Sequence, residues 1–391
     1  GICSLVVIGL LGYVVMNNGK MWRLSDPNDN VPISPEKRFA LADSRLQEAK
    51  KWLAVNHGID HPSELDVLMA AGGLAMERQE YEYAIECFQQ VPTDHVRFGL
   101  TARFEEAMAF LKLNSAQAAE DTLREYLDYA RKSPLIEPAQ VGDAFKWLTY
   151  LLSVQLRLEE RELLLSEQHQ IGLADPLDSK QLYFPNLLLL NSPRGRARLQ
   201  QFLERDSESL KLQIAKMRYE VPGGQFEAAI SGLTELMKSS NQDLAVSAVL
   251  AEAYMESDRT EEFRGLLASL PEYHPTEPRL LTRMRGEYSL IEERWQQAAE
   301  FFSNVLRVEP SNSPSQMGLA LAYQGLDDNE KYLVALHRAS VLAKIRVNLG
   351  NVQPDAAQAC LELAQHCRDI GMVDAAACFE NHSVRIREAG E

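Results

Sequence analysis

The sequence is poor in cysteine and carries fewer basic than acidic residues. Its 391 residues include five cysteines, an odd number for so long a chain, and Cys3 lies inside an apolar N-terminal run. This is not the pattern of a disulfide framework, so we expect the fold not to depend on disulfides. Lys and Arg number 40 against 56 Asp and Glu, which gives a net charge of −16. Because nucleic-acid binding needs a basic face, we expect no nucleic-acid partner.

Catalytic motifs are also missing. The sequence has no P-loop, no dinucleotide-binding glycine fingerprint, no His-Glu-x-x-His, no Gly-x-Ser-x-Gly and no Cys-x-x-Cys-His. Its runs of acidic residues are typical of solvated faces rather than of buried acid–base pairs. These runs are Glu105 with Glu106, Glu159 with Glu160 and Glu162, and Glu261 with Glu262. We therefore predict a protein that is not an enzyme and that needs no cofactor.

One constellation contains ligand types that zinc prefers. Cys360, His366, Cys367, Cys378 and His382 fall within one predicted helical hairpin. A zinc site needs about four such ligands converging as a tetrahedron. The spacings here are not those of a known zinc finger, and cysteine often acts as a small core residue in helices. We predict ordinary packing and no metal.

The longest apolar run lies at the N-terminus. Residues 2–16 carry no charge, and Asn17 to Lys20 end the run. At 1.5 Å per residue they reach about 22 Å, short of the roughly 30 Å hydrocarbon core, so we expect the segment to continue upstream. A signal peptide would need a small-x-small cleavage site, which does not follow Met16. We predict an uncleaved, single-pass membrane anchor over residues 1–17 and a juxtamembrane linker over residues 18–37.

The side of the membrane stays open. Lys20 and Arg23 favour a cytoplasmic position for the residues that follow, but residues before Gly1 could reverse that preference.

From Pro35 onward, amphipathic helices of about a dozen residues alternate with short turns, and β-rich alternation is almost absent. The fold class is therefore all-α.

The helices repeat. The clearest unit begins near Arg279 and has Gly286 in its first helix, Ala298 and Phe302 in its second, and Pro310 at its end. This spacing resembles the tetratricopeptide repeat, a helix-turn-helix unit of ~34 residues. Trp295 also lies where that family favours a large aromatic residue. A second strong copy contains Gly72, Ala75, Ala84 and Phe88, and weaker copies lie around Ala107, Phe226, Leu250, Leu319 and Leu363.

The resemblance covers most of residues 60–130 and 205–385, and implies an α-solenoid of stacked helix pairs. Residues 174–196 contain three prolines and no sustained helical period. We predict that they form an irregular linker between an N-terminal lobe, residues 38–173, and a C-terminal lobe, residues 197–391. Residues 187–190, four leucines, are predicted to be a buried packing element, with an exposed partner patch as the alternative.

The resemblance also implies a concave surface lined by the first helix of each pair. In the repeat's register this lining mixes apolar and acidic side chains. Its residues are Glu252, Met255, Arg283, Glu287, Leu290, Met317 and Leu321, with Ala245, Ala248 and Gln324 beside them. Tetratricopeptide adaptors that grip a terminal carboxylate use paired Lys, Arg and Asn here, and that pattern is absent.

This lining suits an amphipathic or extended protein segment with apolar and some basic groups. The alternative is that the face is solvated or packed against the chain's own segments. We predict a membrane-tethered, non-catalytic scaffold or adaptor that binds a protein or peptide. The alternatives are a constitutive structural subunit of a larger membrane complex and, less favoured, a metal-dependent factor using the Cys/His cluster.

Overall fold

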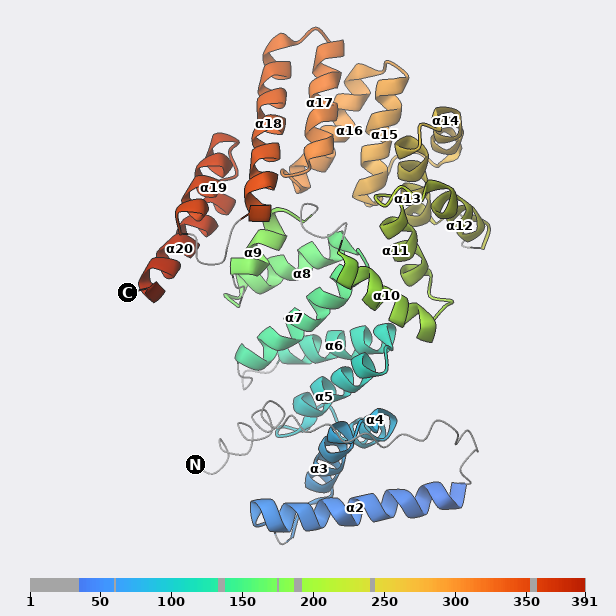
Figure 1. The fold of residues 1–391 in the computed structure, drawn as a ribbon, viewed down its shortest axis with the longest axis vertical. Coiled ribbons are helices and arrows are strands. Elements are labelled where there is room, and N and C mark those ends of the chain that lie inside the picture. The colour runs from blue at the N-terminus through green and yellow to red at the C-terminus, as the bar shows by residue number, and fades with distance from the viewer. Residues whose placement is uncertain are drawn as a thin grey trace. The chain divides into compact units, whose positions relative to one another are not determined.

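The computed structural model describes residues 35–59, 61–132, 138–173, 176–185, 192–239, 243–351 and 357–390 (Figure 1). Across these residues every regular element is a helix, as predicted for an all-α fold. None of the helices in these ranges combines the length and the apolar composition that a membrane span requires. The predicted anchor, residues 1–17, and most of the predicted linker, residues 18–37, lie outside the described residues. The chain forms two compact units, Gly1–Pro134 and Leu135–Glu391.

The first unit consists of helices that pack in sequence order. They are α2 (Pro35–His57), α3 (Glu64–Glu77), α4 (Tyr81–Gln89), α5 (Gly99–Lys112) and α6 (Ala116–Ala130). A capping box starts α3: the Ser63 hydroxyl accepts the N–H of Asp66, and the Asp66 carboxylate accepts the N–H of Ser63. This arrangement satisfies two N–H groups that the first turn leaves free.

The second unit continues the same pattern over fourteen helices of the described chain. They are α7 (Pro138–Val154), α8 (Leu158–Gln170), α9 (Pro176–Tyr183), α10 (Pro193–Arg205), α11 (Leu210–Glu220), α12 (Phe226–Ser239), α13 (Leu244–Glu256), α14 (Thr260–Ser269), α15 (Arg279–Ile291), α16 (Trp295–Val308), α17 (Ser313–Gly325), α18 (Asn329–Asn351), α19 (Ala357–Asp369) and α20 (Val373–Gly390). From α11 to α20 they are arranged as successive antiparallel pairs (Figure 1).

Eight helix pairs in the described part of the chain share one kind of turn. In each, a residue just after the first helix has a left-handed backbone, with φ between 52° and 76°. These residues are Gln79, Asn114, Leu156, Gly224, Asp258, Glu293, Asp327 and Gly371. The next N–H donates to a carbonyl of the last helical turn, as from Arg294 to Ser289 at 2.8 Å, which is a Schellman-type cap.

The turns also fix the repeat length. From Gly224 through Asp258 and Glu293 to Asp327, the left-handed residue recurs every 34 or 35 positions. This spacing confirms the predicted period. Only two of the eight residues are glycine, so the turn geometry is imposed by the repeat and not by glycine alone.

Small and aromatic residues of the repeat are contact partners. Phe302 is fully buried, and a Cβ built on Gly286 would lie 2.7 Å from its ring. Gly318 of the next pair faces the same ring at 2.3 Å. In the first unit Gly72 faces Phe88 in the same way, at 2.5 Å. Glycine is required at these positions because any side chain would displace the ring that joins neighbouring helices.

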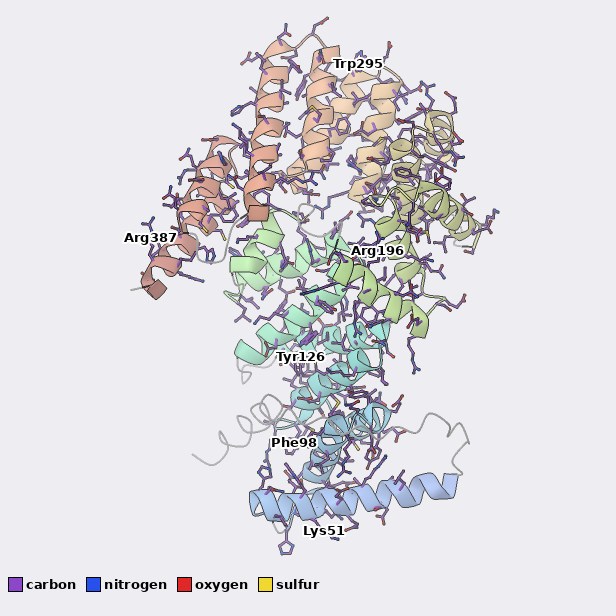
Figure 2. The ribbon with its side chains drawn as sticks, viewed as in Figure 1. Lys51, Phe98, Tyr126, Arg196, Trp295 and Arg387 are labelled. Atoms are coloured by element: carbon purple, nitrogen blue, oxygen red, sulfur yellow. The ribbon has the colours of Figure 1, made fainter. Side chains whose placement is uncertain are left out.

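Trp295 is the first residue of α16 (Figure 2). A Cβ on Gly325 would lie 2.3 Å from the indole ring. The predicted large aromatic at the start of the second helix therefore also packs against a small residue of the following pair.

The predicted linker, residues 174–196, differs from expectation. It contains α9, and the first residues of α10 begin at Pro193 after a cap in which Ser192 accepts the N–H of Gly195 at 3.1 Å. The contact boundary between the compact units lies at Pro134 and Leu135 instead. Residues 187–190 lie outside the described residues.

The reason is that α9 is a packing element rather than a spacer. It contacts α8 and α20, so it connects the start of the second unit to its end (Figure 1). Phe184, just after α9, is fully buried and stacks on Phe379 of α20 with ring centroids 6.1 Å apart. A helix of eight residues is too short for its periodicity to reveal such a role.

Candidate partner-binding surface

The seven predicted lining residues lie on the first helices of three successive pairs. Helix α13 carries Glu252 and Met255, α15 carries Arg283, Glu287 and Leu290, and α17 carries Met317 and Leu321. Helix α13 packs on α15 and α15 packs on α17. The residues therefore belong to one surface of adjacent helices, although their environments differ.

Two of the charged residues are already paired. The Arg283 guanidinium Nη2 donates to Glu252 Oε1 at 2.6 Å. Their side chains are 11% and 22% exposed, so this ion pair is mostly shielded from solvent. It joins α13 to α15, and both side chains contribute to the packing of the repeats.

The apolar members divide into two groups. Met255 is half-buried against the core around Phe263, and Leu290 is half-buried against the core around Phe302. In contrast, Met317 and Leu321 of α17 are 43% and 46% exposed. The open apolar part of the predicted surface is therefore on α17. Ala248, expected beside it, is buried instead.

Glu287, on the middle one of the three helices, is the remaining charged residue of the predicted surface. It is half-buried, and among the described residues it makes no hydrogen bond and no ion pair. Burial raises the pKa of the Glu287 carboxyl, the nearby Arg283 lowers it, and Glu256 raises it further. A carboxylate in this position would gain from a cation that replaces its lost hydration.

The first helices of successive pairs together form one face of the array, which we call the inner face. Part of this face is covered by the chain's own α7–α8 pair. Arg218 of α11 donates from Nη1 to the carbonyl of Leu156, in the α7–α8 turn, at 2.5 Å. Burial lowers the pKa of this guanidinium, while Glu252 and Glu159 raise it. The predicted alternative, packing against the chain's own segments, thus applies to this part of the face.

A second contact, which we term the clasp, is formed by Arg279, Glu159, Glu162 and Glu309. The backbone N–H of Arg279 donates to Glu159 Oε1 at 2.8 Å, and its Nη2 donates to Glu162 Oε2 at 2.5 Å. Its Nη1 lies 3.6 Å from a carboxylate oxygen of Glu309. The clasp holds α8 against the start of α15 and against the α16–α17 turn.

The clasp corrects one sequence prediction. Glu162 was expected on a solvated face, but its side chain is 16% exposed, and burial raises its pKa while Arg279 lowers it. Glu106 likewise is buried, with its carboxylate 2.6 Å from Arg103 Nη1. The expectation holds for Glu261, which is 83% exposed. Charge runs alone cannot show burial, because the Arg279 partner is distant in sequence.

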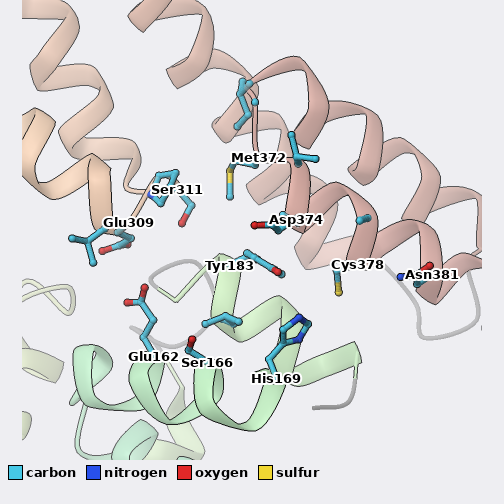
Figure 3. A pocket seen from close by; sticks show the side chains of 18 of the residues that line it. Glu162, Ser166, His169, Tyr183, Glu309, Ser311, Met372, Asp374, Cys378 and Asn381 are labelled. Atoms are coloured by element: carbon cyan, nitrogen blue, oxygen red, sulfur yellow. The ribbon is translucent and has the colours of Figure 1, made fainter. Parts of the chain in front are cut away.

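A cavity of about 820 Å³ lies within the second unit, beside the clasp (Figure 3). Side chains of α8, α9, the α16–α17 turn and α20 line it, among them Glu162, His169, Tyr183, Asp374 and Cys378. Arg338 and Arg385 also border it. This lining mixes both signs of charge with apolar groups. The sequence does not reveal this cavity, because helices that are distant along the chain form it.

Comparison with known proteins bears on this arrangement. A family model described as the tetratricopeptide repeat matches residues 223–283, which run from the α11–α12 turn into α15. This stretch of the chain is tetratricopeptide repeat sequence. A search of curated proteins finds no match to this repeat protein.

Among solved structures, the repeat protein is similar to a tetratricopeptide repeat protein from Parabacteroides merdae, with 12% identity, 66% of this chain and 98% of that chain covered, and a TM-score of 0.33. It is also similar to a chain of the Cut9–Hcn1 hetero-tetramer, with 15% identity and a TM-score of 0.36. The match covers 90% of this chain and 74% of that chain. A third similarity is to MamA, with 14% identity and a TM-score of 0.27. The match covers 44% of this chain and 95% of that chain. No function follows from scores this low.

The C-terminal cysteines of the repeat protein are packing residues in its described part. Cys360 and Cys367 are fully buried, and burial raises the pKa of Cys367 to about 12. Cys378 and His382 border the cavity instead. Within the described residues, no group of three or more Cys, His, Asp or Glu side chains could hold a metal ion.

Proposed function

We propose that this tetratricopeptide repeat protein is a non-catalytic scaffold that binds a segment of another protein on the inner face of α15 and α17. The observation that supports the proposal is the exposure of Met317 and Leu321. They lie one helical turn apart, on the helix that continues a surface whose other members are paired or half-buried. An apolar strip of this kind on a repeat's inner face suits helix-in-groove recognition.

The strip can supply a useful part of a binding energy. Nearly half of the Met317 and Leu321 side chains remains exposed. Covering the remainder would contribute about 1 kcal/mol for each residue, since complete burial of such side chains is worth about 1.5–3 kcal/mol. A partner therefore needs further contacts.

We further propose that residues 2–16 tether the scaffold to a membrane. This apolar run carries no charge. A tether raises the effective concentration of a bound partner at the membrane without new contacts. The full chain should stay with the membrane fraction after alkaline extraction, whereas a chain lacking residues 1–17 should be released. Release of both chains would overturn the tether and leave the scaffold proposal intact.

Affinity capture with paired variants tests the scaffold proposal. Met317→Asp with Leu321→Asp places two negative charges on the strip, and Val347→Asp places one at a 62% exposed position on α18. We expect a partner to be captured by the native chain and the Val347 variant and lost with the double variant. A stoichiometric partner that survives all three would favour the alternative of a constitutive structural subunit, and the proposed surface would be wrong.

A further inference from the structure

Two neighbouring repeats place acidic residues at equivalent positions. Glu252 lies six residues before the left-handed turn residue Asp258, and Glu287 lies six residues before its counterpart Glu293. The turns share one geometry, so the two carboxylates occupy the same position on α13 and on α15. What each one meets is set by the first helix of the following repeat.

The first helices of the two following repeats differ at the position that faces this carboxylate. Arg283 lies ten residues before Glu293, and Met317 lies ten residues before Asp327, so these two are also equivalent. Arg283 reaches back from α15 to Glu252 at 2.6 Å. Met317 of α17 occupies the position relative to Glu287 that Arg283 occupies relative to Glu252, but its side chain is an uncharged thioether. The repeat therefore forms this inter-helix ion pair once and lacks its cation in the next repeat.

Two buried acids in the described chain nearby each lie beside an arginine, Glu309 beside Arg279 and Glu277 beside Arg285. Glu277, 6% exposed, accepts two bonds of 3.0 Å from Arg285 Nε. Arg283, the cation nearest to Glu287 on its own helix, is committed to Glu252. Burial raises the pKa of Glu287 in spite of Arg283, which is consistent with a carboxylate that lacks sufficient compensation.

We propose that Glu287 accepts a Lys or Arg side chain of the bound protein segment, completing from outside the ion pair that Arg283 completes for Glu252. This inference rests on the proposed function and specifies its partner: a segment with a basic residue close to apolar residues that pack on Met317 and Leu321. Charge complementarity selects this occupant. An acidic segment would place like charges together at Glu287 and at the adjacent Glu256.

Peptide selection on the full chain tests the specificity. The probe is a display library of random 12-residue peptides, selected on the native chain and then measured individually. We expect binders that carry Lys or Arg within four residues of a large apolar residue. Glu287→Gln should weaken them about tenfold, as expected when one partner of a half-buried ion pair is removed. The matched Glu256→Gln change, at an exposed acid nearby, should alter affinity less than about twofold.

The outcomes separate the two proposals. Binders that depend on Leu321 but lack basic residues, or that bind Glu287→Gln unchanged, would overturn the role of Glu287 and leave the scaffold surface standing. A selection that yields no Leu321-dependent binder would overturn both.

A second variant tests the repeat equivalence without any ligand. Met317→Arg supplies the missing cation from within the chain, at a position 43% exposed that tolerates a long side chain. We expect the pKa of Glu287, followed by carbon NMR of the labelled carboxyl, to fall in this variant, and basic peptides to bind about tenfold more weakly. Met317→Gln should leave the Glu287 pKa unchanged and weaken the peptides only by the lost apolar contact, about fivefold for about 1 kcal/mol. An unchanged Glu287 pKa in the arginine variant would contradict the inference.

Discussion

Replacing Arg279 with methionine should loosen α8 from the inner face of the repeat array. Methionine keeps the backbone N–H that Glu159 accepts, but it removes the guanidinium whose Nη2 lies 2.5 Å from Glu162. The two side chains are 17% and 16% exposed. The stabilisation from this ion pair should therefore be intermediate. An exposed ion pair contributes about 0–1 kcal/mol, and disrupting a buried ion pair costs about 3–5 kcal/mol. We expect a loss of about 2 kcal/mol, because Glu162 stays half-buried without its cation.

Hydrogen exchange of the α8 amides measures this loss directly. If these amides exchange through release of the helix, about 2 kcal/mol corresponds to exchange about 30-fold faster. Arg259→Met is the matched control, because it removes an exposed pair with Glu262 and should leave α8 exchange unchanged. Equal protection of α8 in the native chain and in Arg279→Met would refute the role assigned to the clasp.

Three further predictions follow from burial and packing. Gly286→Ala should lower the thermal midpoint, because its Cβ would lie 2.7 Å from an aromatic ring, whereas Gly265→Ala, with no atom within 4 Å, should add up to about 1 kcal/mol to the free energy of unfolding. Burial raises the pKa of Glu287, so ionisation of this carboxyl lowers the stability of the fold as pH rises above about 4.5. Glu287→Gln should therefore stabilise the protein at about pH 7. In melting experiments at different pH, this gain should be absent below about pH 4. Iodoacetamide at pH 8 should modify Cys378 before Cys367, whose pKa burial raises to about 12, and the reverse order in peptide mass spectrometry would contradict that assignment.

The regular part of the fold could be predicted from the sequence because its contacts are local. Gly286 and Phe302 lie in one helix pair, and the same small and aromatic spacing recurs at Gly72 and Phe88. Such spacing specifies how two adjacent helices approach. It predicted the period that the left-handed turn residues display, while the amphipathic helices after Pro35 predicted the all-α class.

The remainder depends on contacts between distant residues. Neither the clasp between Glu162 and Arg279 nor the stacking of Phe184 on Phe379 leaves a periodic trace in the sequence. The predicted surface residues lie on the first helices of three successive pairs. The sequence could not separate Arg283, which is paired, from Glu287, which makes no ion pair with any described residue. That difference comes from the single position in the next repeat where arginine is replaced by Met317.

Site-specific photocrosslinking tests the central claim most directly. A photoreactive phenylalanine analogue at position 321 of the full chain would sit on the exposed strip of α17, and the same analogue at position 347 would sit on α18 at a still more exposed position. With the protein captured by the native chain, we predict a crosslink from position 321 and none from position 347. A partner that crosslinks equally from both positions, or from position 347 alone, would contradict binding on the inner face of α15 and α17.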